Sequence, residues 1–347
     1  MNYNKYSIIF KQEANNQGLS EDEIEVYLTY AKVLLDKSLP IIYNQDHLSK
    51  LLGIHPIYLY TLTNSSDKFY RKFKINKKNG KKRNIEEPLS ILKEAQYWIL
   101  EHILLKCSCS NYTKAFKANS SIKENAKFHK KQNIVINLDI EDYFGTIKGH
   151  KVYEFFRTLG YNNEVSIMLT KICTNKDSLP QGSPTSPYLS NIITENLDNK
   201  LAELAKKEEY GLRYTRYADD ITFSTNNKIN ITNLIIDTKY VLKQEGFKIN
   251  YKKTKVISSN KRQMVTGIVV NDKLQVSKQQ RRKVRQAMYY IEKYDLESHI
   301  RNIGWQKGKD KYLRHLLGNI NFVLFINPKD KEHLKYKSQL IQKLKEI

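Results

Sequence analysis

The chain has 347 residues with 40% hydrophobic content, enough to form two or three globular subdomains. Its 59 Lys and Arg residues against 36 Asp and Glu residues leave a net charge of +23, which favours a polyanionic partner such as nucleic acid. No apolar run approaches the ~18 residues that cross a bilayer, and the N-terminus is unlike a signal peptide, so we expect a cytoplasmic protein without membrane contact whose three cysteines are free thiols.

Helical patterns dominate the first part of the chain. Residues 21–36 have helical periodicity and follow Ser20, a residue suited to cap a helix N-terminus. Two shorter helices are expected between residues 47 and 63, interrupted near Gly53 and Pro56. The stretch that begins at residue 21 is acidic, unlike the rest of the chain, and is therefore a candidate surface for a protein partner.

Residues 70–84, YRKFKINKKNGKKRN, contain eight Lys or Arg residues and no acidic residue. Phe73 and Ile75 alternate with charged residues before an Asn-Gly pair, a pattern that predicts a β-hairpin. A solvated basic loop is the alternative explanation for such a run of charge. A hairpin with this charge density is better suited to binding phosphate groups.

The rest of the chain alternates between helical and strand patterns. An amphipathic helix is expected at 89–106, and the apolar run NIVINLDI at 133–140 predicts a buried strand that ends at Asp139. Further helices are expected at 150–174, around 187–206 and near 232–246, a strand pair at 213–224, and strands at 247–257 and 265–276. From Ser277 onward 17 Lys and Arg residues oppose 7 acidic residues, which indicates a separate basic, helical domain.

Three aspartates stand at the ends of predicted strands. Asp139 ends one strand, and Asp219 and Asp220 form a turn about 80 residues later. If these strands are neighbours the carboxylates meet, and two unit charges ~4 Å apart repel by about 4 kcal/mol near a protein surface. Divalent cations reverse this, because Mg²⁺ prefers carboxylate oxygens and a pair of such ions supports phosphoryl transfer. Asp-Asp pairs are also common in ordinary turns, so the motif by itself leaves both interpretations open.

Other motifs surround these aspartates in a definite order: KKNGKKRNIEEP, AFKANSSIKENAKFH, INLDIEDYFGTI, LPQGSPTSPYLSNI, YTRYADDITFS, EGFKINYKKTKV and MVTGIVV. Over about residues 70–276 this order resembles the reverse transcriptases, and NAKFH at 125–129 with VTG at 265–267 resembles the retron members of that family. The resemblance implies an α+β right-hand polymerase. Its parts would be an N-terminal helical extension (1–69), fingers interleaved with part of the palm (70–132), a palm with an antiparallel sheet (133–276) and a basic helical thumb (277–347).

The resemblance also implies roles for particular residues. Asp139, Asp219 and Asp220 would be catalytic and would hold two Mg²⁺ ions, with the Ile140 carbonyl as a further ligand. The residues expected to contact the incoming nucleotide are Arg83, Lys82, Asp142, Phe144, Gln181 and Lys253. Phe144 would exclude a ribose 2′-OH. The alternatives are that Phe144 is a core residue, or that the neighbouring Tyr143 has this role instead. Likewise Lys81 could act in place of Lys82, and Lys252 in place of Lys253.

Contacts with RNA or primer are implied for two further motifs. Asn125 and His129 are four residues apart and would share one face of a helix, toward RNA or an effector, or as a structural hydrogen-bonded pair. Val265, Thr266 and Gly267 would allow close approach of a nucleic-acid backbone, because glycine lacks a Cβ atom.

In the thumb, the residues expected to bind RNA are Arg281, Arg282 and Arg285. They lie among aromatic residues, a combination suited to phosphates and to stacking on exposed bases. An aromatic core with a solvated basic face is the alternative arrangement.

The family implies an RNA-directed DNA polymerase that binds its cognate structured non-coding RNA and primes from a guanosine 2′-OH. It would use dNTPs to make branched multicopy single-stranded DNA (msDNA), and would act in anti-phage defence with an effector protein as partner. One rival is a group II intron-like or other bacterial reverse transcriptase, which template choice would distinguish. Another is a non-catalytic RNA-binding scaffold, which Mg²⁺-dependent dNTP incorporation would exclude.

Overall fold

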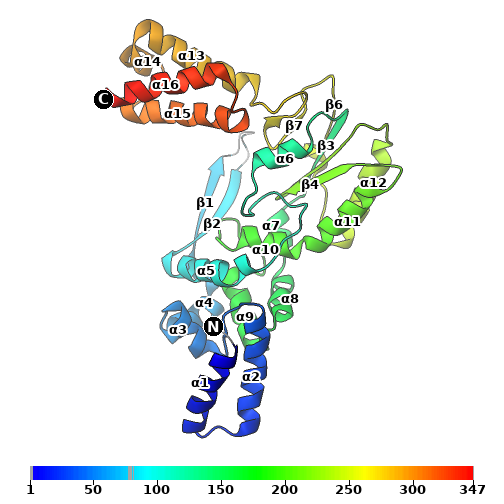
Figure 1. The fold of residues 1–347 in the computed structure, drawn as a ribbon, viewed down its shortest axis with the longest axis vertical. Helices are drawn as coiled ribbons and strands as arrows, with labels where there is room; N and C mark the ends of the chain where they lie inside the picture. Colours follow the sequence, from blue (N-terminus) through cyan, green and yellow to red (C-terminus); the bar gives the residue numbers. More distant parts are fainter. Residues whose placement is uncertain (1–2, 77–79, 81, 347) are drawn as a thin grey trace. The chain divides into compact units, whose positions relative to one another are not determined.

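The computed structural model describes residues 3–76, 80 and 82–346. Helices predominate and are combined with antiparallel sheets, which confirms the predicted α+β class (Figure 1). The chain forms two compact units: 1–118, 140–202 and 235–249 make the first, and 119–139, 203–234 and 250–347 make the second. The four-part division at residues 69, 132 and 276 stays a prediction.

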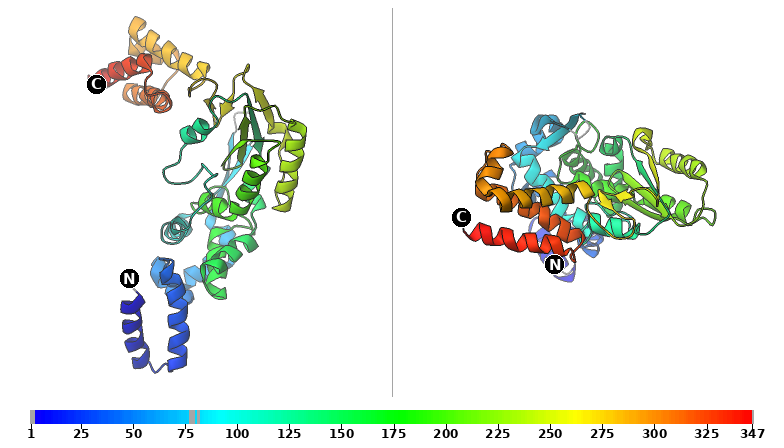
Figure 2. Two further views of the ribbon diagram at one scale, coloured as in Figure 1. Left: turned by 45° about the vertical axis from the view of Figure 1, so that its right-hand side comes forward. Right: turned by 90° about the horizontal axis from the view of Figure 1, so that it is seen from above.

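The first unit begins with helices whose ends follow from their capping residues. α1 (Tyr3–Asn16) and α2 (Glu21–Asp36) form an antiparallel pair (Figure 2). Ser20 and Glu23 form a capping box, in which the Ser20 amide donates to the Glu23 carboxylate at 2.9 Å. α3 (Gln45–Leu52) ends at Gly53 in the left-handed conformation, and α4 (Pro56–Asn64) begins with proline. The predicted helices in this region are therefore confirmed.

The basic hairpin consists of β1 (Tyr70–Asn76) and β2 (Lys82–Pro88), paired antiparallel after the 3₁₀ turn η1 (Ser66–Phe69). The Glu86 amide donates to the Gln181 carbonyl at 2.9 Å, so the LPQG turn lies against β2. Gly182 in this turn has a φ of 138°, and a Cβ atom there would come within 2.6 Å of the Glu86 carbonyl oxygen. Only glycine fits this close approach.

Helices complete the first unit: α5 (Ser90–His102), η2 (Leu104–Lys106), α7 (Tyr143–Thr146), α8 (Gly149–Leu159), α9 (Asn163–Cys173), α10 (Ser186–Ile193), and parts of α11 (Glu195–Lys206) and α12 (Ile231–Gln244). The single helical stretch expected at 150–174 is two helices. Gly160 adopts a φ of 108° at the end of α8, and the Asn162 side chain caps α9. The helix expected at 89–106 likewise ends at His102 and continues as the short turn η2.

A four-stranded antiparallel sheet organises the second unit, in the order β4 (Arg213–Tyr217), β5 (Asp220–Thr225), β3 (Ile134–Asp139) and β6 (Lys255–Ser258). Residues 221–225 of β5 are all buried, so both faces of the sheet are covered there. The strand expected at 247–257 is shorter than predicted, because residues 251–253 form a 3₁₀ turn, η3 (Tyr251–Lys253), before β6 begins.

The remaining elements of the second unit are α6 (Ile122–Phe128), the short strands β7 (Met264–Val265) and β8 (Ile268–Val269), and the helices α13 (Lys278–Tyr294), α14 (Leu296–Asn302), α15 (Lys309–Ile326) and α16 (Lys331–Lys345). The four C-terminal helices share an apolar core that includes Met288 and Leu313. Val323 and Ile326 of α15 belong to a second apolar cluster, with Ala126 of α6. This cluster joins the C-terminal helices to α6, β3 and the β7–β8 turn.

No helix in the described part of the chain combines the length and apolarity needed to cross a membrane. Cys107, Cys109 and Cys173, all within the described residues, form no disulfide. Burial raises the pKa of Cys107 to about 11 and that of Cys173 to about 12. These two cysteines therefore stay protonated at neutral pH and are poor nucleophiles.

Candidate active site

Three aspartates lie at one end of the four-stranded sheet. β3 and β5 pair with Asp139 directly opposite Asp220, and Asp219 is the residue before Asp220 in the β4–β5 turn. The charges of Asp139 and Asp219 both act on Asp220. The sheet register thus brings together three side chains that are separated in the sequence.

The β4–β5 turn has a strained backbone. Tyr217 pairs with Asp220, which leaves Ala218 and Asp219 as a two-residue loop, and Ala218 has a φ of 56°. Positive φ at the first loop residue is the pattern of a type II′ turn, where glycine is usual, and a residue with a Cβ atom costs about 1 kcal/mol there. Arg216 is fully buried, and its guanidinium donates to the Ala218 carbonyl at 3.0 Å. Arg216 therefore positions the turn, a role that the sequence analysis missed because an arginine within a strand is ordinarily exposed.

Asp139 is held by two neighbours that follow α12. The backbone amide of Asn250 donates to the Asp139 carbonyl at 2.8 Å, and its side-chain amide donates to the Asp139 carboxylate at 3.1 Å. Lys253 donates to the other carboxylate oxygen at 2.5 Å. Partial burial disfavours protonation of Lys253, but the hydrogen bond to Asp139 and the nearby aspartate charges outweigh it and raise its pKa. The structure thus places Lys253, rather than Lys252, at the carboxylates.

The proximity of the three carboxylates is reflected in the pKa of Asp220. Loss of solvent around the carboxyl, followed by the charges of Asp219 and Asp139, raises the pKa of Asp220 to about 6, although Lys253 and Lys255 act in the opposite direction. A cluster of hard oxygen donors that repel one another fits a divalent cation, which would neutralise them. The donor set at this end of the sheet therefore suits the divalent metal use of the family described below.

Arg83, Lys82 and Gln181 lie on or against β2 in the first unit. Arg83 and Lys82 are both exposed, and Arg83 pairs across the hairpin with Ile75. Neither cation has a salt bridge within the described residues. Gln181 is half-buried and is tied to β2 through Glu86. Lys81, the rival to Lys82, lies outside the described residues.

Phe144 and Tyr143 occupy different surroundings in the first unit. Tyr143 is buried, and its hydroxyl donates to the Ser190 carbonyl at 3.2 Å. Phe144 is half-buried, and its ring lies 6.4 Å from the ring of Phe116, which is itself exposed. Tyr143 is therefore a core residue, and Phe144 is the one whose ring is accessible. Asp142 is exposed and precedes α7, with a φ of 44°.

Asn125 and His129 lie inside the second unit, where both are fully buried. The imidazole bonds to the Thr215 hydroxyl and to the Ser224 hydroxyl, each at 2.7 Å, and Thr215 also donates to Asn125 at 2.6 Å. Burial and the charge of Arg213 lower the pKa of His129 to about 3, so the ring is neutral. This network ties α6 to β4 and β5. The geometry favours the structural alternative for the pair over direct contact with RNA.

The VTG motif forms the turn between β7 and β8. Thr266 and Gly267 have φ values of 47° and 85°, the pattern of a type I′ turn, and the Thr266 hydroxyl donates to the Ile122 carbonyl at 3.3 Å. Val265 is fully buried in the apolar cluster that contains Val323 of α15. The turn and α6 thus form the surface on which the end of α15 packs, and Gly267 is exposed at the tip.

The thumb arginines differ from one another. Arg281 contacts Asp330 at 2.9 Å, and Arg285 makes a bidentate pair with Glu332 at 2.6 and 2.8 Å. The Arg285 hydrogen bond lowers the pKa of Glu332 to about 2. These pairs connect α13 to the start of α16. Arg282 is exposed and has no salt bridge within the described residues, so it is the one of the three whose guanidinium remains available for phosphate.

Comparisons with known proteins agree with this geometry. Residues 75–307 match the family described as reverse transcriptase (RNA-dependent DNA polymerase). The chain is 33% identical over 314 residues to the retron Ec86 reverse transcriptase of Escherichia coli, covering 89% of this chain and 93% of that protein. It is 38% identical to the retron Ec73 reverse transcriptase of Escherichia coli, covering 58% and 68%, and 29% identical to the retron Mx65 reverse transcriptase of Myxococcus xanthus, covering 85% and 71%.

Among solved structures, a telomerase of Candida albicans has a TM-score of 0.45 and 11% identity, covering 79% of this chain and 63% of that one. That likeness adds nothing to the assignment, which rests on the matched family and on the retron relatives. The match spans the strands that carry Asp139, Asp219 and Asp220. The chain therefore belongs to the reverse transcriptases and, within them, to the RNA-directed DNA polymerases of bacterial retrons.

Proposed function

We propose that this polymerase copies part of its cognate structured non-coding RNA into msDNA, starting from the 2′-OH of a guanosine in that RNA. The register that sets Asp139 opposite Asp220, beside Asp219, is the observation that carries the proposal. The net charge of +23 supports binding of a large folded RNA, because phosphate contacts dominate such affinity. The relatives named above, all called retron reverse transcriptases, support this template class.

We propose Asp139, Asp219 and Asp220, with the Ile140 carbonyl, as the residues that would hold two Mg²⁺ ions. When bound, the ions would lower the pKa of the primer hydroxyl and neutralise charge on the transferred phosphate. The mutual repulsion that raises the pKa of Asp220 supports this role.

Several further residues are proposed to bind and orient the nucleotide. Lys253 is protonated and bonded to Asp139, so it could supply a proton to the leaving pyrophosphate. The exposed guanidinium of Arg83, assisted by Lys82, suits bidentate contact with the triphosphate. Gln181 would lie near the sugar, and Asp142 would complete the nucleotide surface.

Substitution of Asp219 tests the catalytic assignment. Asp219→Asn is expected to lower Mg²⁺-dependent dNTP incorporation on an oligo(dT)–poly(rA) duplex by roughly 10³-fold or more, because a metal ligand and its charge are lost. Asp272→Asn, which changes an exposed aspartate of the same unit, is the matched control. Absence of incorporation by the unsubstituted chain, or full activity of Asp219→Asn, would contradict the proposal. Priming from a 2′-OH is tested separately by whether product DNA stays joined to RNA through a 2′–5′ bond.

Phe144 is proposed as the residue that excludes ribonucleotides. Its half-buried ring can occupy the space of a 2′-OH, whereas Tyr143 is fixed in the core. Phe144→Ala is expected to lower the preference for dNTPs over rNTPs, measured as the ratio of kcat/KM values, by roughly 10- to 100-fold. Tyr143→Phe keeps the core ring and serves as control. An unchanged ratio in Phe144→Ala would remove the assignment.

We further propose that the enzyme acts in the cytoplasm with an effector protein in anti-phage defence. The exposed acidic start of α2, Glu21, Asp22 and Glu23, stands out in so basic a chain and supports a protein-facing surface there. We expect the chain to co-purify with the protein encoded by an adjacent reading frame. The double variant Glu21→Lys, Asp22→Lys should recover less of that protein. Equal recovery of the partner protein by the unsubstituted chain and by the double variant would exclude this surface.

A further inference from the structure

The second unit contains a cavity that the carboxylate site does not use. It has a volume of about 260 Å³ and lies between α13, α15 and the segment after α14. Its floor is apolar and includes Val284 and Leu316. The volume is below the ~300–1,000 Å³ typical of sites for whole small molecules, so the cavity suits a single ring system.

The walls of this cavity are aromatic and held in place. Trp305 lies 5.6 Å from the ring of His315 and 5.4 Å from that of Tyr312. The Trp305 indole N–H donates to the Gly308 carbonyl at 3.0 Å, and the Tyr312 hydroxyl bonds to His299 at 2.7 Å. Because the polar atoms of both rings already have partners, their remaining contribution to a ligand is stacking and apolar contact.

The rim of the cavity is polar and cationic. Gln280 and Asn319 bring side-chain amides to it, and Lys283 brings an exposed ammonium group that has no salt bridge within the described residues. The C-terminal region from residue 277 carries 17 Lys and Arg residues against 7 acidic ones. Aromatic walls, amides and surplus positive charge fit a base with its attached phosphate better than an apolar protein side chain.

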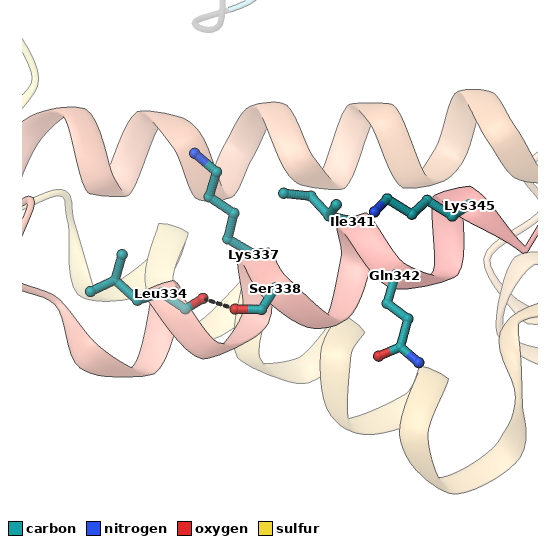
Figure 3. Close-up of a pocket in the computed structure, with 6 residues that line it drawn as sticks. All are labelled: Leu334, Lys337, Ser338, Ile341, Gln342 and Lys345. Atoms are coloured by element: carbon teal, nitrogen blue, oxygen red, sulfur yellow. Dashed lines mark hydrogen bonds between the residues drawn. The ribbon is translucent and has the colours of Figure 1, made fainter.

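A second hollow in the same unit lacks the aromatic residues that line this cavity. That hollow, of about 620 Å³, is lined only by residues of α16, among them Leu334, Ile341 and Lys345 (Figure 3). Its side chains spread along a single helix and include no aromatic ring. It offers no aromatic face on which a base could stack, and we assign it no ligand.

We propose that the cavity between α13 and α15 binds one unpaired nucleobase of the RNA, stacked on Trp305 and His315, with Lys283 on a neighbouring phosphate. The proposal rests on the RNA binding of the proposed function and adds a recognition site for a loop or bulge in that RNA. Fully paired RNA would meet the basic surface of the thumb but leave the cavity empty.

Fluorescence of Trp305 reports directly on the cavity. The chain has two tryptophans, and Trp98→Phe in α5 leaves Trp305 as the single tryptophan, which excitation at long wavelength separates from the tyrosines. Three RNA probes are compared in this background: a hairpin with an unpaired loop, the same hairpin with abasic loop positions, and a blunt duplex with equal phosphate number. The loop hairpin is expected to quench Trp305 and to bind roughly 5- to 100-fold more tightly than the other two. Equal quenching by the abasic hairpin would overturn the proposal.

A substitution that blocks the cavity provides the second measurement. Asn319→Phe places a ring at an exposed rim position, where loss of folding is not expected, and should remove the preference for the loop hairpin. Asn321→Phe makes the same change at an exposed position of α15 outside the cavity and should preserve it. A preference retained in Asn319→Phe would contradict the proposal. Extension of oligo(dT)–poly(rA) by the unsubstituted chain tests the polymerase function independently, so the two proposals fail separately.

Discussion

At one end of the four-stranded sheet three aspartates repel one another, whereas farther along the sheet Thr215 of β4 and Ser224 of β5 bond to His129, the residue that ends α6. Both clusters belong to sequence motifs of the family, so motif strength does not separate them. What separates them is charge: the aspartates carry like charges that repel one another even though Asp139 is bonded to Asn250 and Lys253, whereas the imidazole and hydroxyls of the network are neutral and bond to one another. Repulsion between like charges marks a place suited to a cation, and a neutral, mutually bonded network marks a place where the fold is stabilised.

Removing the His129 side chain should destabilise the folded chain through loss of its buried hydrogen bonds. His129→Ala leaves two buried hydroxyls without their partner and a cavity beneath α6, so the free energy of unfolding at pH 7 should fall by about 3 kcal/mol. Urea denaturation followed by circular dichroism measures this loss. Lys127→Ala, at an exposed position of the same helix, should change stability by about 0.5 kcal/mol or less. A loss below about 1 kcal/mol for His129→Ala would show that the network is not structural.

The pH dependence of stability sharpens the same comparison. In the unfolded chain His129 gains a proton as the pH falls through about 6.5, but in the folded chain it stays neutral until about pH 3. The unfolded state therefore binds more protons, and the stability contributed by neutral His129 is present above pH 6.5 and lost below it. The stability gap between the unsubstituted chain and His129→Ala should narrow by about 2 kcal/mol between pH 7 and pH 5. A constant gap in urea denaturation at the two pH values would refute this.

Neutralising Asp220 should stabilise the folded chain, which is the opposite of the effect expected for His129→Ala. Its pKa of about 6 lies above the ordinary value, so ionisation at neutral pH costs the folded state stability. Asp220→Asn should raise the free energy of unfolding at pH 7 in EDTA by about 1 kcal/mol, after allowance for solvent at this exposed side chain. Saturating Mg²⁺ should cancel the gain, because the cation stabilises only the unsubstituted site. A variant less stable in EDTA would mean that the carboxylates are not in conflict.

The local parts of the fold could be predicted from the sequence. The capping box at Ser20, the β4–β5 hairpin and the end of β3 at Asp139 all depend on residues near one another in the chain. The break between α8 and α9 was missed, because Gly160 is tolerated within a helical pattern until its backbone conformation is seen. The convergence of the aspartates followed from the family's motif order, since strand pairing is not evident from periodicity.

Non-local partnerships were beyond the sequence. Arg281 and Arg285 resemble free phosphate-binding residues until α16 brings Asp330 and Glu332 beside them. Arg216 appears as one more basic residue until its burial beneath the turn is known. In each case the partner is set by tertiary packing, and composition alone overstates how much of the positive charge is available to RNA.

The hydrogen bond from Glu86 to Gln181 has a consequence for motion during catalysis. The backbone of β2 and the LPQG turn are joined at a point where Gly182 leaves no space for independent displacement. A shift of the hairpin that carries Arg83 must therefore move Gln181 with it. The contacts proposed for Arg83 with the phosphates and for Gln181 near the sugar would then change together.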